Sequence, residues 1–245
     1  MDETPGFVFQ LPHYSSFAID RNTFTWYKGK AWLSGNPNNE AFIAELPEIL
    51  EETYFGILRN RGYQAFRLNY EPRWENRLTQ VFKGMRRAMG LRLYFHLDAL
   101  EHAWNLDIPD GYQVQRIDRS LLASTDLRNL DMVIEEVKSE RSSTDDFLQK
   151  SFGYCAINGD TITSWCMSEY NTGNRCELGI FTIESHRRIG LATLTARAVI
   201  RHALTHGINQ IGWHCWADNQ PSIATALRIG FKQKHQYNVQ TIQVG

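Results

Sequence analysis

Cys-Glu-Leu-Gly-Ile-Phe-Thr-Ile (176–183) and Glu-Ser-His-Arg-Arg-Ile-Gly-Leu-Ala (184–192) are the two stretches that decide the fold of this chain. The first predicts a strand, the second a turn, and the apolar spacing that follows predicts a helix over about 191–206. Small residues at Gly190 and Ala192 leave backbone N–H groups uncovered where this helix begins, and the two arginines of the turn add positive charge. Because free N–H groups at a helix N-terminus bind anions, the turn indicates a ligand that carries a pyrophosphate.

The residues after this helix continue the same pattern. Gly207 is a suitable residue to end the helix, and 208–216 predicts the next strand. Asp218 or Asn219 can cap a further helix that Gly230 ends. A strand, a crossover helix and a second strand in one sheet predict a parallel pair with a right-handed connection.

The segments before residue 176 predict a strand, helices and hairpins. Residues 112–117 alternate like a strand, and apolar spacing over 119–138 predicts one or two helices. Asn158-Gly159 lies between two apolar runs, and Asn-Thr-Gly-Asn (171–174) follows, so two hairpin turns are expected. The second half of the chain therefore predicts a mixed sheet of the α/β class, with a hairpin meander before the crossover.

The first half has a similar order of predicted elements but no convincing residue-level repeat. Pro-Asp-Gly (109–111) is strong turn chemistry and sets the expected boundary between a domain of residues 1–108 and a domain of residues 109–245. A decayed duplicate of the second half is one hypothesis for the first domain. Its expected strands and helices, in the order β-α-β-α-β, cover 31–34, 39–59, 63–70, 73–89 and 90–97.

Composition limits the functional class. The chain has 245 residues, is 42% hydrophobic and carries a formal net charge of −1 from 26 basic and 27 acidic residues. This balance gives no indication of a nucleic-acid partner. No apolar run approaches the roughly 20 residues of a membrane span. The N-terminal Met-Asp-Glu-Thr-Pro-Gly lacks the regions of a signal peptide, so we expect a cytoplasmic protein with no membrane partner.

The cysteines and histidines do not predict a metal site. Cys155, Cys166, Cys176 and Cys215 form no C-x-x-C pair, and their apolar neighbours predict buried, reduced thiols. His202 and His206 would share a helical face, but no third ligand is evident, so surface histidines are the favoured interpretation and no metal is expected.

Arg187-x-x-Gly190-x-Ala192, in its strand–turn–helix context, resembles the signature of the GNAT superfamily of acetyl-coenzyme A-dependent N-acetyltransferases. Asn219-x-x-Ser222 and the ending Leu-Arg-Ile-Gly-Phe (227–231) are similar to a second motif of that family. The whole combination resembles a bacterial subfamily whose members are labelled "GNAT acetyltransferase". The resemblance covers residues 112–244 well and residues 1–108 loosely, and it implies a GNAT fold for the second half.

The resemblance also implies how acetyl-coenzyme A binds. Backbone N–H groups around the turn would hold the pyrophosphate, and the pantetheine arm would lie between two strands that splay apart. Asn219 and Ser222 would reach pantetheine or phosphate oxygens. The expected binding residues are Phe181, Thr182, Arg187, Arg188, Ile189, Gly190, Leu191, Ala192, Asn219 and Ser222.

The implied chemistry is direct attack of an amine on a thioester. A lysine-type amine has a pKa of about 10.4 and is mostly charged at neutral pH, so a base must take its proton. Glu177, on the strand that borders the splay, is the first candidate base, and Glu169 on the hairpin strand is the second. Glu177 can equally be read as a surface strand residue or a member of an ion pair. A strand N–H can stabilise the developing oxyanion.

The chain departs from the family pattern at Ala226, where many members have a tyrosine that protonates the departing thiolate. Tyr237 is a candidate substitute, although a core or surface tyrosine is the plainer interpretation. His214 can contact substrate or serve as a structural histidine. Trp165, Trp213 and Trp216 can line an acceptor pocket or belong to the core.

Three functions follow from the resemblance. The first is transfer of acetyl from acetyl-coenzyme A to a small-molecule amine. The second is transfer to a protein amine, which would require an open groove beside the splay. The third is a degenerate protein that binds acyl-coenzyme A without catalysis, which Ala226 and the divergent first half motivate. The first half can cover the acceptor side or form the surface of a homodimer.

Overall fold

The computed structural model divides the chain into two units. Unit 1 comprises Met1–Arg92 and Gln236–Gly245, and unit 2 comprises Leu93–His235. The chain leaves unit 1 within strand β5 (Arg87–Asp98) and returns to it within strand β11 (Lys232–Gln243). The structure describes residues 15–19, 21–98 and 104–244. The N-terminal segment that we expected to lack a signal peptide lies outside these residues.

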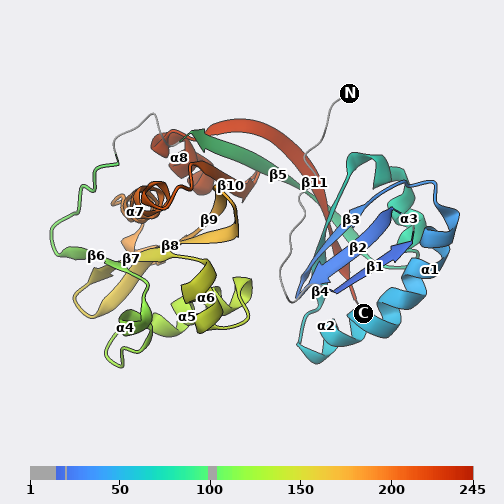
Figure 1. Ribbon diagram of the computed structural model, residues 1–245, viewed down its shortest axis with the longest axis horizontal. Helices are drawn as coiled ribbons and strands as arrows, with labels where there is room; N and C mark the ends of the chain where they lie inside the picture. Colours follow the sequence, from blue (N-terminus) through green and yellow to red (C-terminus); the bar gives the residue numbers. More distant parts are fainter. Residues whose placement is uncertain (1–14, 20, 99–103, 245) are drawn as a thin grey trace. The chain divides into compact units, whose positions relative to one another are not determined.

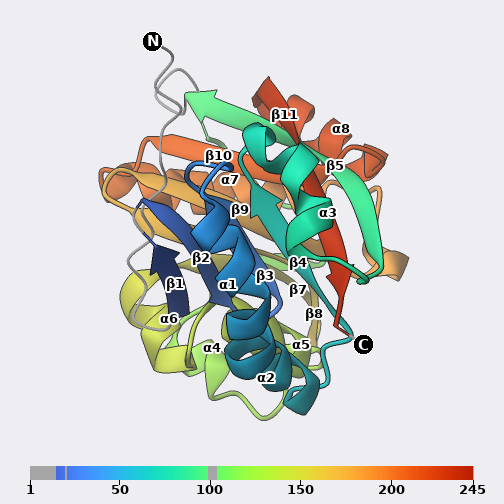
Figure 2. The same ribbon diagram turned by 90° about the vertical axis from the view of Figure 1, so that its right-hand side faces the viewer.

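Unit 1 is an α/β unit in which one face of a sheet carries the helices (Figure 2). The sheet order is β1-β2-β3-β4-β11, with β3 and β4 parallel and the other neighbours antiparallel. Its strands, besides β11, are β1 (Ser15–Ile19), β2 (Asn22–Tyr27), β3 (Lys30–Ser34) and β4 (Ala65–Tyr70). Its helices are α1 (Glu40–Leu50), a π-helical turn (Glu51–Phe55), α2 (Gly56–Asn60), a 3-10 helix (Pro72–Arg77) and α3 (Leu78–Val81).

Unit 2 is a sheet with helices on both faces (Figure 1). The strand order is β5-β10-β9-β8-β7-β6, and β9 and β10 are parallel, as predicted for the crossover. The strands other than β5 are β6 (Tyr112–Arg116), β7 (Gly153–Asn158), β8 (Thr161–Thr172), β9 (Arg175–Thr182) and β10 (Gln210–Trp216). The helices are α4 (Arg119–Leu122), α5 (Leu130–Glu140), α6 (Thr144–Lys150), α7 (Leu191–Thr205) and α8 (Gln220–Ile229).

The core of unit 2 has a layer on each side of its sheet. Figure 1 shows α7 and α8 on one face, and α4, α5 and α6 on the other. Alternate strand residues supply the two layers, since successive side chains of a strand point to opposite faces. Leu178 and Trp213 pack in the layer of α7 and α8, whereas Trp165 and Met167 pack in the layer of α5 and α6. All four cysteines are buried and unpaired, as predicted.

The prediction of an α/β mixed sheet is confirmed, but one element prediction in the first half was wrong and one hairpin was not predicted. The helix predicted over 73–89 ends at Val81, because Gly84 takes φ +80° and Arg87 already begins β5. The hairpin of β1 and β2 was missed. The expected domains 1–108 and 109–245 stay a prediction; the two compact units change over after Arg92 and again after His235. No helix among the residues that the structure describes is long and apolar enough to cross a bilayer.

Candidate functional site

The turn between β9 and α7 presents a run of unused backbone donors. Arg188 and Gly190 both have left-handed backbone conformations, with φ +67° and φ +89°. Gly190 is the N-cap of α7 and provides no side-chain cap, and the first helical bond runs from the N–H of Leu194 to the carbonyl of Gly190. The N–H groups from Arg188 to Thr193 donate to no acceptor among the residues described. Such a run at a helix N-terminus is an anion-binding site.

The residues of the turn leave these donors accessible. A Cβ at Gly190 would meet no heavy atom within 4 Å. Ile189 is 45% exposed, whereas Leu191 is buried and anchors the start of the helix in the core. The exposed Arg187 donates from Nε to the carbonyl of Thr182 at 3.2 Å, which holds its guanidinium beside the end of β9. The structure thus brings together the turn residues that the sequence predicted as binding residues.

Strands β9 and β10 stop pairing before either of them ends. Their ladder consists of the pairs Arg175–Gln210, Cys176–Ile211 and Glu177–Gly212. β9 then continues to Thr182 and β10 to Trp216 without further pairing between them. On its other side β9 stays paired with β8 from Glu177 to Thr182. One edge of β9 is therefore available for an extended ligand along Phe181 and Thr182.

The side chains of Asn219 and Ser222 already have partners within the protein. Asn219 is the N-cap of α8, and its Oδ1 accepts the N–H of Ser222 at 3.2 Å. The hydroxyl of Ser222 accepts the indole N–H of the buried Trp213 at 3.0 Å. Both residues therefore hold the start of α8, while the Asn219 amide and the Ser222 hydroxyl hydrogen keep donors that a ligand can use.

Glu177 is held by a histidine at the last pair of the ladder. Its Oε1 lies 3.0 Å from Nε2 of His214 on β10, and the two side chains are 21% and 22% exposed. Since a carboxylate only accepts, Nε2 carries the hydrogen of this bond. Oε2 has no partner among the described residues. The geometry thus leaves one carboxylate oxygen of Glu177 available as a proton acceptor.

Glu169 lies directly across from Glu177 in the β8–β9 pairing. Its carboxylate lies over Gly179, so that a Cβ on this glycine would overlap the carboxylate oxygen. Both candidate bases are therefore on the same face of the sheet. Glu169 is farther from the β9–β10 ladder because it belongs to β8.

Tyr94 on β5, which no sequence signal indicated, completes this face. The ring of Tyr94 on β5 lies 4.6 Å from the ring of His214 and 4.8 Å from that of His235. A Cβ on Gly212 would lie 3.0 Å from Cε2 of Tyr94, 3.4 Å from its hydroxyl and 3.2 Å from Cγ of Glu177. Tyr94 precedes the boundary that we expected at residue 108, and only the strand order shows that β5 lies beside β10. No sequence motif marks it.

The two positions considered for a thiolate acid differ in their surroundings. Ala226 is fully buried in the core beside α7. Tyr237 is half-buried and belongs to unit 1, whereas Glu177 belongs to unit 2. A role of Tyr237 in the site thus stays a prediction.

The aromatic residues near the site differ in their exposure to solvent. Trp213 is buried under Ser222, and Trp165 is buried with the exposed Phe181 stacked on it at 4.8 Å. Trp165 and Trp213 are therefore core residues, while Phe181 offers an apolar surface on β9.

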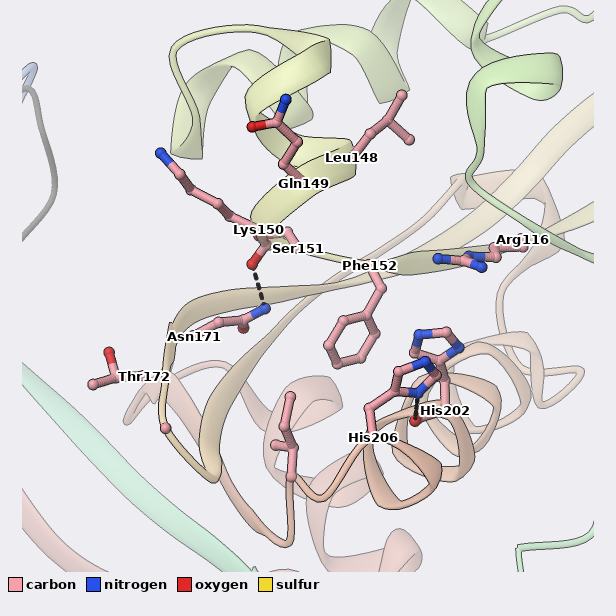
Figure 3. Close-up of a pocket in the computed structure, with 12 residues that line it drawn as sticks. Arg116, Leu148, Gln149, Lys150, Ser151, Phe152, Asn171, Thr172, His202 and His206 are labelled. Atoms are coloured by element: carbon pink, nitrogen blue, oxygen red, sulfur yellow. Dashed lines mark hydrogen bonds between the residues drawn. The ribbon is translucent and has the colours of Figure 1, made fainter.

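A surface cavity of about 430 Å³ lies at the opposite end of α7 from the turn (Figure 3). His202 and His206 line it together with Arg116 and Phe152, and the two imidazole rings stack at 4.1 Å. Burial, together with the charges of the neighbouring His206 and Arg116, lowers the pKa of His202 to about 4. Within the described residues, no group of three or more histidine, cysteine or acidic side chains is arranged to hold a metal ion.

Comparisons with known proteins agree on one family for this chain. The family model described as GNAT acetyltransferase matches residues 15–240. The protein named uncharacterized N-acetyltransferase YdfB, from Bacillus subtilis (strain 168), is 30% identical over 215 residues, which cover 86% of this chain and 77% of that protein.

Solved structures share the fold at lower identity. A GCN5-related N-acetyltransferase-like protein from Streptococcus suis has a TM-score of 0.63 and 18% identity, covering 94% of this chain and 89% of that one. A tandem GNAT protein from the clavulanic acid biosynthesis pathway has a TM-score of 0.58 and 12% identity, covering 91% of this chain and 78% of that one.

Proposed function

Because the chain belongs to the GNAT acetyltransferase family, we propose that it transfers an acetyl group from acetyl-coenzyme A to the primary amine of a small molecule. The observation that carries this proposal is the run of unused N–H groups from Arg188 to Thr193, next to an unpaired edge of β9. The relative that is 30% identical is named an N-acetyltransferase, which supports an amine as the acceptor.

The chain's own residues fit coenzyme A at this place. The N–H groups of the turn would hold the pyrophosphate, and the open space at Gly190 lets a phosphate approach the backbone. The edge of β9 at Phe181 and Thr182 would pair with the amide groups of the pantetheine arm. Asn219 and Ser222 would donate from the start of α8. When bound, the coenzyme supplies an activated acetyl group as a thioester.

Glu177 would remove a proton from the acceptor amine. Its Oε2 is the acceptor, while the N–H of His214 holds Oε1 and fixes the direction of the carboxylate. General base catalysis of this kind contributes typically 10²- to 10⁴-fold to a rate. His214 acts through Glu177 and is a positioning residue.

The partial burial of Glu177 and His214 favours an acceptor molecule with a slender amine-bearing group. The side chains of Glu177 and His214 are 21% and 22% exposed, so an alkyl amine reaches Oε2 more readily than a branched or bulky group does. We therefore expect small primary amines to be acceptors, and Glu169 adds a second negative charge on the same face that favours a cationic molecule.

The test is release of the coenzyme thiol from acetyl-coenzyme A with a panel of small primary amines, and with a lysine-containing peptide in parallel. We expect turnover with at least one small amine and a 10²- to 10⁴-fold lower kcat for Glu177→Gln. Glu135→Gln, on the exposed face of α5, is the matched control and should keep the wild-type kcat. Turnover with the peptide alone would contradict the small-molecule proposal, and no turnover with any amine would contradict catalysis.

A further inference from the structure

Two functional side chains meet over Gly212, at the point where β9 and β10 stop pairing. Both side chains close over the bare backbone of Gly212: a Cβ there would lie 3.2 Å from Cγ of Glu177 and 3.4 Å from the hydroxyl of Tyr94. Glu177 comes from β9, Gly212 from β10 and Tyr94 from β5, so three neighbouring strands build this place. A base and a phenol therefore lie close together over Gly212.

Stacking holds the phenol ring of Tyr94, and none of the described residues forms a hydrogen bond with its hydroxyl. Its ring packs between the imidazoles of His214 and His235, at 4.6 Å and 4.8 Å. Its hydroxyl has no hydrogen-bond partner among the described residues, and Tyr94 is only half-buried. A tyrosine whose ring is fixed by stacking and whose hydroxyl is left for another molecule is placed as a donor.

The surroundings keep this phenol protonated. Burial raises the pKa of Tyr94, the charge of Glu177 raises it further, and Arg175 opposes both. The charged or titratable groups that face it are therefore Glu177 and Arg175 from β9, His214 from β10 and His235 from β11. At neutral pH the hydroxyl has its proton to give.

The proposed reaction needs such a donor. When an amine displaces a thiol from a thioester, the sulfur leaves as a thiolate whose conjugate acid has a pKa of about 8.5, so protonation assists its departure near neutral pH. Ala226 of α8 is buried and carries no proton. We propose that the hydroxyl of Tyr94 donates its proton to the departing sulfur of coenzyme A, across Gly212 from Glu177. This inference rests on the proposed function.

The step balances in protons and electrons. The lone pair of the neutral amine forms the carbon–nitrogen bond, and the carbon–sulfur bond breaks with its electron pair on sulfur. Oε2 of Glu177 takes the proton that the nitrogen loses, and the Tyr94 hydroxyl gives its proton to the sulfur. The tyrosinate then regains a proton from the Glu177 carboxyl or from water, so that the products are an amide and a thiol and both side chains are restored.

Binding of coenzyme A tests the contact between Tyr94 and sulfur without turnover. Wild type, Tyr94→Phe and Tyr154→Phe are titrated calorimetrically at pH 8.5 with coenzyme A and with desulfo-coenzyme A, which lacks the sulfur. Tyr94→Phe keeps the stacked ring and removes only the hydroxyl. Because a hydrogen bond to a charged group contributes about 1.5–3 kcal/mol, Tyr94→Phe should bind coenzyme A about tenfold or more weakly and desulfo-coenzyme A with unchanged affinity.

Tyr154 is the matched control. Its hydroxyl bonds Nδ1 of His202 at 3.2 Å, at the end of α7 that is remote from the turn. Tyr154→Phe should therefore bind both compounds like the wild type, and thermal unfolding shows that each variant is folded.

A rate measurement separates the acid from the base. Hydroxylamine is largely uncharged at neutral pH, so its acetylation depends little on Glu177 and still requires departure of the thiolate. Tyr94→Phe should lower kcat with hydroxylamine about 10²-fold, and Glu177→Gln should lower it less than that.

The outcomes distinguish this inference from the proposed function. If wild type binds coenzyme A and acetylates hydroxylamine, and Tyr94→Phe matches it in both, the role of Tyr94 is overturned and the proposed function stands. Equal weakening toward coenzyme A and desulfo-coenzyme A would show a packing role only and would also overturn the inference. A wild type that binds neither compound would overturn the proposed function, and the role of Tyr94 with it.

Discussion

Replacing Gly212 with alanine should lower the catalytic rate strongly and the stability of the fold only modestly. Gly212 pairs with Glu177 at the end of the β9–β10 ladder, and its φ lies outside the left-handed region, so alanine fits the backbone. The new methyl group would lie 3.0 Å from Cε2 of Tyr94 and 3.2 Å from Cγ of Glu177. These distances are a few tenths of an ångström tighter than ordinary contacts, so both side chains must move apart.

The two contributions to stability have opposite signs. Alanine restricts the unfolded chain and stabilises by about 0.4–1 kcal/mol, whereas overpacking costs about 1–3 kcal/mol. We therefore expect a free energy of unfolding lower by about 0–2.6 kcal/mol. Activity is more sensitive, because a displacement of about 1 Å in a reacting group can reduce a rate about 10²-fold. The smaller displacement of Glu177 and Tyr94 should lower kcat about 10- to 100-fold.

The assay is the initial rate of thiol release from acetyl-coenzyme A, with thermal unfolding measured on the same preparations. Gly56→Ala is the matched control, since a Cβ there meets no atom within 4 Å and Gly56 is helical, with φ −59°. Alanine should stabilise this helix by up to about 1 kcal/mol and leave kcat unchanged. A Gly212→Ala variant with wild-type kcat would refute the assignment of the site to this end of the ladder.

Three further predictions concern the supporting structure. Ser222→Ala leaves the indole N–H of the buried Trp213 without its acceptor. Urea unfolding should therefore show a free energy of unfolding lower by about 1–3 kcal/mol, and a decrease below about 0.5 kcal/mol would contradict this role of Ser222. Asn219→Ala removes the cap of α8 and should lower the free energy of unfolding by about 0.5–2 kcal/mol. Asn219→Asp keeps a capping oxygen and should retain most of the wild-type stability. Equal losses in the two variants would show that capping is not the cause. The pKa of His202 is about 4 in the folded state and about 6.5 when unfolded, so below pH 6.5 the unfolded chain binds the extra proton and stability falls as pH drops toward 4. Thermal unfolding of His202→Gln between pH 4 and 7 should show a flatter decline than the wild type, and an identical slope would exclude His202 as its source.

The turn and the helices of the second half were predictable because their signals are local. Gly190 takes the left-handed conformation that glycine adopts most readily, and Asn219 caps a helix within a few residues of its position in the sequence. Apolar spacing placed α7 and the strands on either side of it, because a buried helix and buried strands each impose a period on the sequence. The candidate base Glu177 was found in the same way, as a polar residue in a strand beside the predicted turn.

The partners of Glu177 could not be predicted, because sheet order is not a local property. His214 meets Glu177 only through the register of β9 and β10. Tyr94 reaches Gly212 only because β5, which lies before the expected boundary at residue 108, is the neighbour of β10. The chain leaves unit 1 at Arg92, in the middle of strand β5, and the sequence has no turn signal there. A domain boundary inferred from turn residues therefore falls after this strand.

Calorimetric titration of the protein with acetyl-coenzyme A, and with coenzyme A and ATP in parallel, tests whether the turn between β9 and α7 binds the coenzyme. We predict micromolar binding of both coenzyme forms, weaker or no binding of ATP, and loss of binding in Gly190→Trp, whose side chain would cover the N–H groups of the turn. Gly207→Trp, with φ +75° at the other end of α7, carries a similar backbone strain and should bind like the wild type. Wild-type affinity in Gly190→Trp, or no binding of acetyl-coenzyme A by the wild type, would contradict coenzyme binding at the turn.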